Sequence, residues 1–167
     1  MVAANHVAYT APINPPGASP VLTYEHIGKL LRRKVHRAEE FVGGAITSTR
    51  VLSTDTTTAT GRPITVREVT FAEGNRKVTE ECVAYPPMKE EFHMDSGNIV
   101  QNIISEGKDG ELFMTFTFEW LHPELEGDAE GLKARELVEK KMAAVAVENT
   151  LRVMREMVKD GRWKEEI

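Results

Sequence analysis

Cysteine and long hydrophobic runs are nearly absent from this sequence of 167 residues. The single Cys82 cannot form an internal disulfide, which excludes a disulfide-stapled scaffold and a zinc site built on several cysteines. No apolar run approaches the ~20 residues that cross a membrane. The segment Met1–Thr10 lacks the basic start and apolar centre of a secretory signal. We therefore expect a cytoplasmic protein without a membrane span.

Positive charge is also scarce, because 26 Asp and Glu residues outnumber 21 Lys and Arg residues. A nucleic-acid-binding protein would normally carry a basic stripe. The one dense basic cluster, Lys29–Arg37, lies on a predicted helix, so nucleic acid is not an expected partner. The sequence has no GxGxxG, phosphate-loop, GxSxG or HExxH motif. His93 and Asp95 alone provide too few ligands for a metal ion. We expect neither a metal nor an organic cofactor.

A long run of helix-forming residues from Gly131 to Lys159 organises the chain. Its apolar residues recur with helical spacing on one face, which predicts an amphipathic helix that needs a large apolar partner. An earlier helix is expected from a cap at Thr23 to about Phe41. The remaining elements are predicted strands separated by short turns: 6–13, 45–52, 64–71, 77–85, 88–94, 98–105 and 112–120. We expect one α+β domain, residues 1–167, in which a curved antiparallel sheet of about seven strands surrounds the long C-terminal helix, with a helical segment after strand 1.

Alternation along the last strand predicts that Met114, Phe116 and Phe118 face this helix. Counting back through two-residue turns at Lys108-Asp109, Ser96-Gly97, Pro86-Pro87 and Gly74-Asn75 predicts which earlier residues share that face. The same count places Cys82 on the opposite, outer face. A slip of one residue reverses every earlier strand, and a slip near Gly74 would place Arg67, Val69 and Phe71 inside. The count assigns these residues to the inner wall: Val66, Glu68, Glu81, Val83, Tyr85, Glu90, Phe92, Met94, Ile99, Gln101 and Ile103.

Three polar residues of this wall are candidates for acid–base chemistry. Apolar surroundings would raise the pKa of Glu68 or Glu81, so that either could move a proton near neutral pH. Tyr85 could donate a hydrogen bond to a carbonyl or enolate oxygen. The alternative is that these glutamates face water or pair with basic neighbours such as Lys77. The candidate ligand-binding residues come from the wall and the long helix: Phe92, Met94, Gln101, Ile103, Met114, Phe116, Phe118, Ala143, Val147 and Thr150.

A resemblance to a known family rests on four segments: AYTAPINPPG at 8–17, LTYEHIGKLLRRKVHRAEEFV at 22–42, REVTF at 67–71 and DGELFMTFTFEWLHP at 109–123. They resemble the fungal AtaL-like branch, named after a gene-cluster protein of acetylaranotin biosynthesis. The branch belongs to the helix-grip superfamily (SRPBCC) of START domains, birch pollen allergens and aromatic polyketide cyclases. The resemblance implies a helix-grip fold with an internal cavity for a hydrophobic small molecule, and a place in secondary metabolism. It brings no catalytic motif that could be carried over residue by residue.

The favoured hypothesis is a protein of secondary metabolism that binds a hydrophobic small molecule. It could also act as a cofactor-independent cyclase or isomerase on a polyketide- or peptide-derived intermediate. One alternative is a non-catalytic carrier of such a ligand. Another is a protein-interaction module, similar to a co-chaperone. Such a module would need an exposed apolar patch on its surface. A core filled by side chains would favour this hypothesis over the first two. The oligomeric state stays open.

Overall fold

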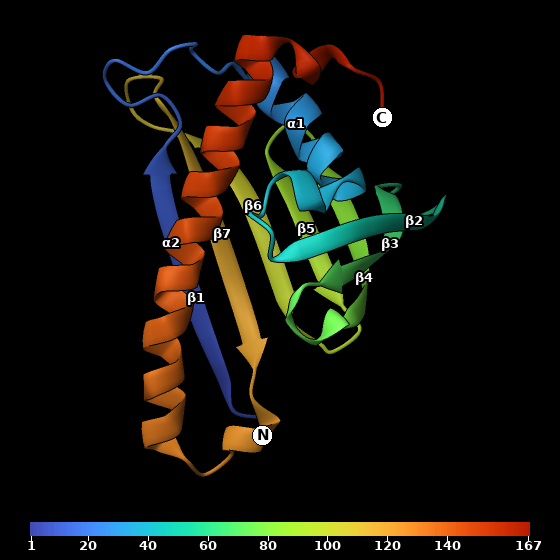
Figure 1. Cartoon of the computed structure of the whole chain (residues 1–167), viewed down its shortest axis with the longest axis vertical. Helices are drawn as coiled ribbons and strands as arrows, with labels where there is room; N and C mark the ends of the chain where they lie inside the picture. The colour runs from blue at the N-terminus through green and yellow to red at the C-terminus, as the bar shows by residue number, and fades with distance from the viewer.

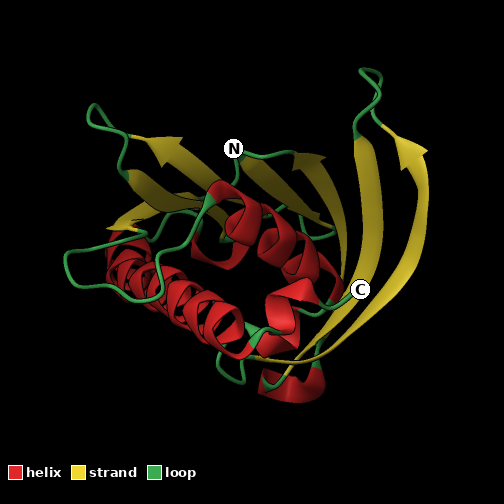
Figure 2. Cartoon of the chain, turned by 90° about the horizontal axis from the view of Figure 1, so that it is seen from above, coloured by secondary structure: helices red, strands yellow, loops and turns green.

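Seven antiparallel strands form one curved sheet that wraps around two helices (Figures 1 and 2). The computed structural model describes all 167 residues. The strands lie in the order β1-β7-β6-β5-β4-β3-β2. They are β1 (Ala4–Pro12), β2 (Ile46–Thr57), β3 (Pro63–Phe71), β4 (Lys77–Tyr85), β5 (Lys89–Met94), β6 (Ile99–Glu106) and β7 (Leu112–Leu121). The helices are α1 (Tyr24–His36) and α2 (Ala129–Asp160), with short 3-10 turns η1 (Ala38–Glu40), η2 (Glu73–Asn75), η3 (Pro123–Leu125) and η4 (Arg162–Lys164). The predicted α+β helix-grip fold is confirmed.

Helix α2 is the predicted long C-terminal helix, and a capping residue marks each of its ends. At its start, the side chain of Asp128 accepts a hydrogen bond from the backbone N–H of Gly131 at 2.8 Å. At its end, Gly161 adopts a left-handed conformation with φ 90°, which glycine tolerates without strain. Neither α2 nor α1 is long and apolar enough to cross a membrane. The predicted apolar face is confirmed by these fully buried residues: Ala143, Val147, Thr150, Met154 and Met157.

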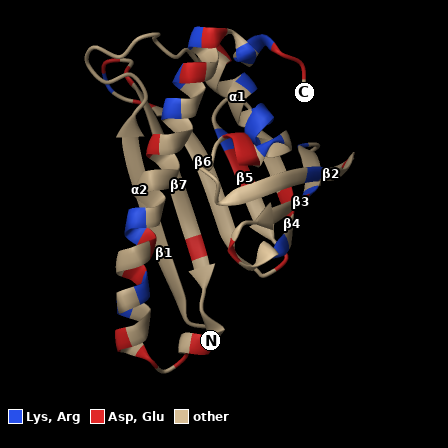
Figure 3. Ribbon diagram, in the orientation of Figure 1, with Lys and Arg blue, Asp and Glu red and all other residues tan.

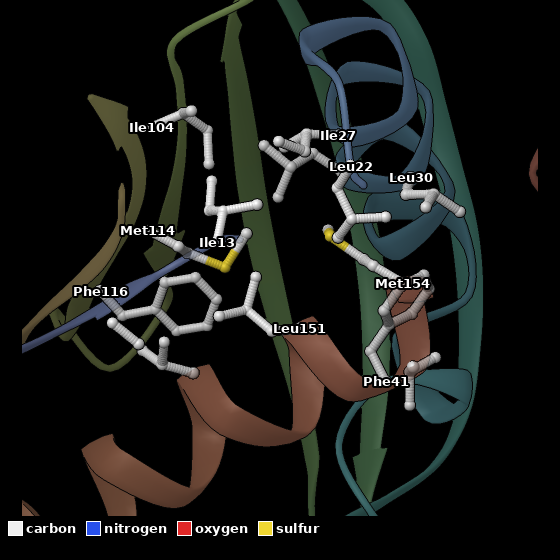
Figure 4. Packing of buried hydrophobic residues seen from close by; sticks show 14 of the residues in the cluster. Ile13, Leu22, Ile27, Leu30, Phe41, Ile104, Met114, Phe116, Leu151 and Met154 are labelled. Atoms are coloured by element: carbon white, nitrogen blue, oxygen red, sulfur yellow. The ribbon is translucent and has the colours of Figure 1, made fainter. Parts of the chain in front are cut away.

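The main core lies where the two helices meet β1 and β7 (Figure 4). Ile27 and Leu30 of α1 pack with Met154 of α2, and Met114 and Phe116 of β7 belong to the same cluster. Each of these five side chains is at most 1% exposed. The helices are therefore fixed to the sheet by close apolar packing, which is the dominant stabilising term in a domain of this size.

Helix α1 begins at its predicted cap but ends earlier than expected. The hydroxyl of Thr23 accepts a hydrogen bond from the backbone N–H of His26. The helix ends at His36, and the turn η1 follows before Phe41. Lys and Arg residues recur along this helix (Figure 3). The last turn of α1 reaches β4 and β5, because Val35 packs with Cys82 and Phe92.

The sheet register confirms part of the predicted inner wall and corrects the rest. Phe116 lies opposite Asn102 and Met114 opposite Ile104, so Gln101 and Ile103 face outward. The reason is a five-residue β6–β7 loop, whereas a two-residue turn was expected. The β5–β6 register, in which His93 lies opposite Ile99, is also offset by one residue from the expected two-residue turn, so the two errors cancel on β5. Phe92, Met94 and Glu90 are therefore on the inner face, as predicted.

The larger error arises at the β4–β5 hairpin. Tyr85 pairs with Lys89 across a three-residue loop, whereas the count assumed a two-residue turn at Pro86-Pro87. Every residue of β4 and β3 is therefore reversed relative to the prediction. Glu81, Val83, Tyr85, Val66 and Glu68 were wrongly placed on the inner wall, and all five lie on the outer face. The inner face instead carries Glu80, Cys82, Ala84, Arg67 and Val69.

Candidate functional site

A cluster of buried polar side chains lies between the end of α1 and the middle of the sheet. Each member comes from a different element, and the register brings them together: Arg67 is opposite Glu80, and Glu90 is opposite Asn102. None is more than 7% exposed. Buried charges are rare unless they are paired or functional. We refer to Lys34, Arg67, Glu80, Glu90 and Asn102 as the inner polar cluster.

Arg67 is the structural centre of the inner polar cluster. Its Nε donates to Glu80 Oε2 at 2.7 Å, and its Nη2 lies 2.5 Å from the same oxygen. Its Nη1 donates to the backbone carbonyls of Lys34 and Val35 at 2.8 Å and 2.7 Å. Those carbonyls belong to the last turn of α1, where no further helical N–H can reach them. Arg67 therefore holds the end of α1 on β3 and β4 at once.

Lys34 has no carboxylate partner. Its Nζ donates to Asn102 Oδ1 at 2.8 Å and lies 4.2 Å from the ring centre of Phe116. Burial, reinforced by the positive charge of Arg67, lowers the pKa of Lys34 to about 7. The amine is therefore partly neutral at physiological pH, unlike that of an exposed lysine.

The carboxyl of Glu90 makes neither a hydrogen bond nor an ion pair with another residue, although the side chain is almost completely buried. Burial raises the pKa of Glu90 to about 7, against the opposing effect of Arg67, Arg32 and Lys34. A carboxyl group with this pKa can both accept and release a proton near neutral pH. The structure thus places a buried carboxyl with a raised pKa at Glu90, whereas the sequence analysis named Glu68 and Glu81.

A pocket of about 110 Å³ connects Glu90 to the surface. Leu31 and Val35 of α1 form one side, and Pro86 and Pro87 of the β4–β5 hairpin form another. The remaining lining residues are three from α1 and four from the strands: Gly28, Arg32, His36, Pro63, Thr65, Ala84 and Lys89. Glu90 is the only acidic residue of this wall, so a ligand in the pocket would meet its carboxyl group.

The opposite pKa shifts of Glu90 and Lys34 predict a pH-dependent stability. The folded protein favours protonated Glu90. The stability that Glu90 contributes to the free energy of unfolding is therefore lost as pH rises toward about 7. The folded protein favours neutral Lys34, so its contribution is gained as pH rises above about 7. Glu90→Gln should therefore gain stability over the wild type by on the order of 2 kcal/mol between about pH 5 and pH 8.

Urea unfolding of both proteins at these pH values would measure this difference. Glu81→Gln is the matched control, because Glu81 is exposed on the outer face and should give a difference that does not change with pH. A Glu90→Gln difference that is equally flat would show that Glu90 titrates normally.

The predicted catalytic residues lie outside this site. Glu68 lies on the outer face, where its Oε1 is 3.2 Å from Lys77 Nζ and 3.3 Å from Arg50 Nη2. This is the alternative arrangement, in which the glutamate pairs with basic neighbours. The hydrogen bond from Lys77 lowers the pKa of Glu68, the reverse of what catalysis would need. The hydroxyl of Tyr85 donates to Glu91, also on the outer face. Glu81 is exposed.

The predicted ligand-binding residues fall into three groups. The first is packed in the interior and is at most 4% exposed: Phe92, Met114, Phe116, Ala143, Val147 and Thr150. Met94 and Phe118 face inward but are half-buried, and Phe118 stacks on Trp120 with ring centres 4.5 Å apart. Gln101 and Ile103 face outward, where Gln101 donates to Glu91 at 3.0 Å. The space between α2 and the sheet is thus filled by side chains at the first group (Figure 4).

Lys34, Arg67, Glu80 and Asn102 were not predicted as site residues. One signal was present for Lys34, because it follows Leu30 and Leu31 at the spacing of the buried face of α1. No sequence pattern marks Glu80 or Asn102, whose positions depend on hairpin loop lengths. No group of three or more His, Cys, Asp or Glu side chains is placed to hold a metal ion.

Comparison with solved structures defines the fold. Zhui aromatase/cyclase from Streptomyces sp. R1128 has a TM-score of 0.58 at 13% identity, over 93% of this chain and 96% of that chain. The di-domain aromatase/cyclase StfQ of the steffimycin pathway has a TM-score of 0.61 at 10% identity, over 94% of this chain and 52% of that chain. XoxI from Bacillus cereus has a TM-score of 0.54 at 10% identity, over 96% and 98%. At these identities the likeness is one of fold, and the fold is helix-grip.

The family follows from the sequence. The family model for acetylaranotin biosynthesis cluster protein L, AtaL, matches residues 7–161. The chain therefore belongs to the AtaL family, as the four segments predicted. No curated protein matches the chain by sequence.

Proposed function

We propose that this protein binds a hydrophobic intermediate of secondary metabolism in the pocket beside Glu90 and catalyses its cyclisation or isomerisation by proton transfer. The observation that carries the proposal is the state of Glu90: buried, unpaired and at the wall of a pocket. Membership in the AtaL family and a fold shared with two aromatase/cyclases support the link to secondary metabolism. Such a ligand would be polyketide- or peptide-derived.

The chemistry needs a group that removes a proton from carbon or oxygen and returns it elsewhere. The carboxylate of Glu90 would accept the proton, and the resulting acid would donate it to the rearranged ligand. Negative charge that develops on a ligand oxygen would lie near Arg32 and Lys89, the two cations that line the pocket. Leu31 and Val35 would keep water from competing for the proton.

A second candidate, a protein-interaction module, is favoured by the surface of α2. Four large apolar side chains on this helix are 49–58% exposed: Leu137, Val138, Met142 and Val145. The packed interior favours the same reading, since much of the region expected to hold a ligand is occupied by side chains. The two candidates make different predictions about small-molecule capture.

Native mass spectrometry of the purified protein after incubation with an extract of its source organism tests the proposal. We expect a captured small molecule that is released in a rearranged form. Gly28→Leu is the blocking variant, because a side chain at Gly28 would enter the open pocket without meeting any atom within 4 Å of its Cβ. It should fold, since leucine has the higher helix propensity, but it should capture nothing.

Each outcome separates the candidates. Release of an unchanged molecule would favour a carrier. Equal capture by the wild type and Gly28→Leu would place the ligand elsewhere. The absence of any captured molecule would favour the interaction module.

A further inference from the structure

One face of α1 lines the pocket beside Glu90 at three successive turns. Gly28, Arg32 and His36 are each four residues apart, so they lie one above another along this face. A Cβ placed on Gly28 would meet no atom within 4 Å, so this part of the face is open. Arg32 is exposed one turn further along the helix. A ligand that enters over Gly28 would therefore meet a guanidinium group.

Arg32 is the one lysine or arginine of α1 that has no partner. Lys29 and Arg33 form ion pairs with glutamates at 3.1 Å and 2.6 Å, and Lys34 donates to an amide oxygen at 2.8 Å. Lys89, the other cation of the pocket wall, lies 2.6 Å from a glutamate of its own strand. Arg32 makes neither a hydrogen bond nor an ion pair with another residue. Its charge is therefore free to bind a ligand.

Two further residues of the pocket wall carry unsatisfied polar groups. His36 lines the pocket, and its Nε2 is buried without a hydrogen-bond partner. Burial, and after it the charge of Arg32, lowers the pKa of His36, so its ring is neutral at pH 7. The carboxyl of Glu90 is unpaired as well. Because native proteins rarely leave buried polar groups without partners, these groups indicate that the pocket takes a polar ligand.

We propose that the ligand of this pocket is an organic acid whose carboxylate pairs with the guanidinium of Arg32. This assignment rests on the proposed function, because it names the chemical class of ligand that the same pocket takes. The planar guanidinium matches the two oxygens of a carboxylate, whereas an ammonium group offers only a point charge. Leu31 and Val35, with the prolines of the β4–β5 hairpin, make much of the remaining wall apolar. A volume of about 110 Å³ admits the end of a carbon chain, so the carboxylate is at or near that end.

Glu90 does not repel such a ligand below about pH 7. Burial raises the pKa of Glu90 to about 7, so at lower pH its carboxyl is mostly protonated and neutral. The charge of Arg32 is among those that oppose this shift, and a carboxylate bound to Arg32 would offset that charge. The complex would therefore favour protonated Glu90, the form in which it can act as a general acid.

Two probes of similar shape and different charge test the proposal. Hexanoate and the neutral hexanamide are titrated into the purified protein at about pH 6, where hexanoate is charged and Glu90 is mostly neutral. Binding is followed by NMR, which detects weak complexes. We expect hexanoate to bind at least about tenfold more tightly than hexanamide, because a hydrogen bond between two charged groups is stronger than a neutral one.

Three variants make the test specific. Arg32→Gln should fold like the wild type, since Arg32 is exposed and unpaired, and should bind the two probes within about twofold of each other. Lys29→Gln removes the same charge from α1 outside the pocket, so it should keep the preference for hexanoate. Gly28→Leu should bind neither probe, because its side chain fills the open space.

The outcomes distinguish this proposal from the proposed function. Equal binding of the two probes by the wild type, or binding of neither, would overturn the assignment of an organic acid. An equal loss of preference in Arg32→Gln and Lys29→Gln would overturn it too, because overall charge would then select the acid. Capture of a neutral molecule from the extract would still agree with the proposed function. A preference for hexanoate that depends on Arg32, with no molecule captured from the extract, would contradict the proposed function alone.

Discussion

Glu90→Gln is expected to lower the turnover of the captured ligand by about 10²–10⁴-fold, the usual contribution of one general acid–base group. The amide of glutamine fills nearly the same volume but cannot carry a proton near neutral pH. Because the carboxyl of Glu90 makes no hydrogen bond or ion pair within the protein, the substitution leaves no other polar group unsatisfied. Affinity should therefore change much less than turnover. Product formation followed by liquid chromatography and mass spectrometry, with binding measured by calorimetry, would give both quantities.

Glu81→Gln is the matched control for turnover. Glu81 lies on β4, the strand that pairs with β5, but it faces outward and is exposed. It should convert the ligand at the wild-type rate. Equal turnover by wild type, Glu90→Gln and Glu81→Gln would remove both carboxyls from the mechanism.

Arg67→Met is expected to lower the free energy of unfolding by ~3–5 kcal/mol, which is the usual effect of removing one partner of a buried ion pair. The substitution leaves the carboxylate of Glu80 buried without its cation, and Glu80 is only 2% exposed. It also leaves the carbonyls of Lys34 and Val35 without the donor that holds the end of α1 on the sheet. Urea unfolding followed by circular dichroism would measure the change.

Two further variants show whether the buried charge is the cause. Arg67→Met combined with Glu80→Leu should recover part of the loss, because no buried carboxylate remains unpaired. Arg50→Met is the surface control, since Arg50 pairs with Glu68 in an exposed position and should change stability by about 0–1 kcal/mol. A loss of less than about 1 kcal/mol for Arg67→Met would contradict the role given to this residue.

The elements of the fold could be predicted from the sequence because their signals are local. Helical spacing identifies the buried face of α2 at Ala143, Val147 and Met154, and alternation identifies the inner face of β7. The faces of β3 and β4 could not be predicted, since they depend on whether the β4–β5 loop has two or three residues. The consecutive prolines Pro86 and Pro87 mark a turn without fixing its length.

The raised pKa of an inner-wall carboxyl could be predicted, but its position could not. The expectation of a carboxyl with a raised pKa on the inner wall is met by Glu90, which the face count included. Glu68 lies on the outer face because the β4–β5 loop has three residues, and there Lys77 lowers its pKa, as the alternative of pairing with a basic neighbour predicted. The burial of Lys34 depends on where α1 crosses the sheet, which is a tertiary property.

The most direct test of the central claim is a ¹³C NMR titration of the glutamate side-chain carboxyls, in the wild type and in Glu90→Gln. We expect one carboxyl in the wild type to titrate at about 7, and we expect its resonance to be absent from the variant. Titration of every glutamate carboxyl below about pH 5, the range of ordinary glutamates, would contradict the assignment of Glu90 as the acid–base group.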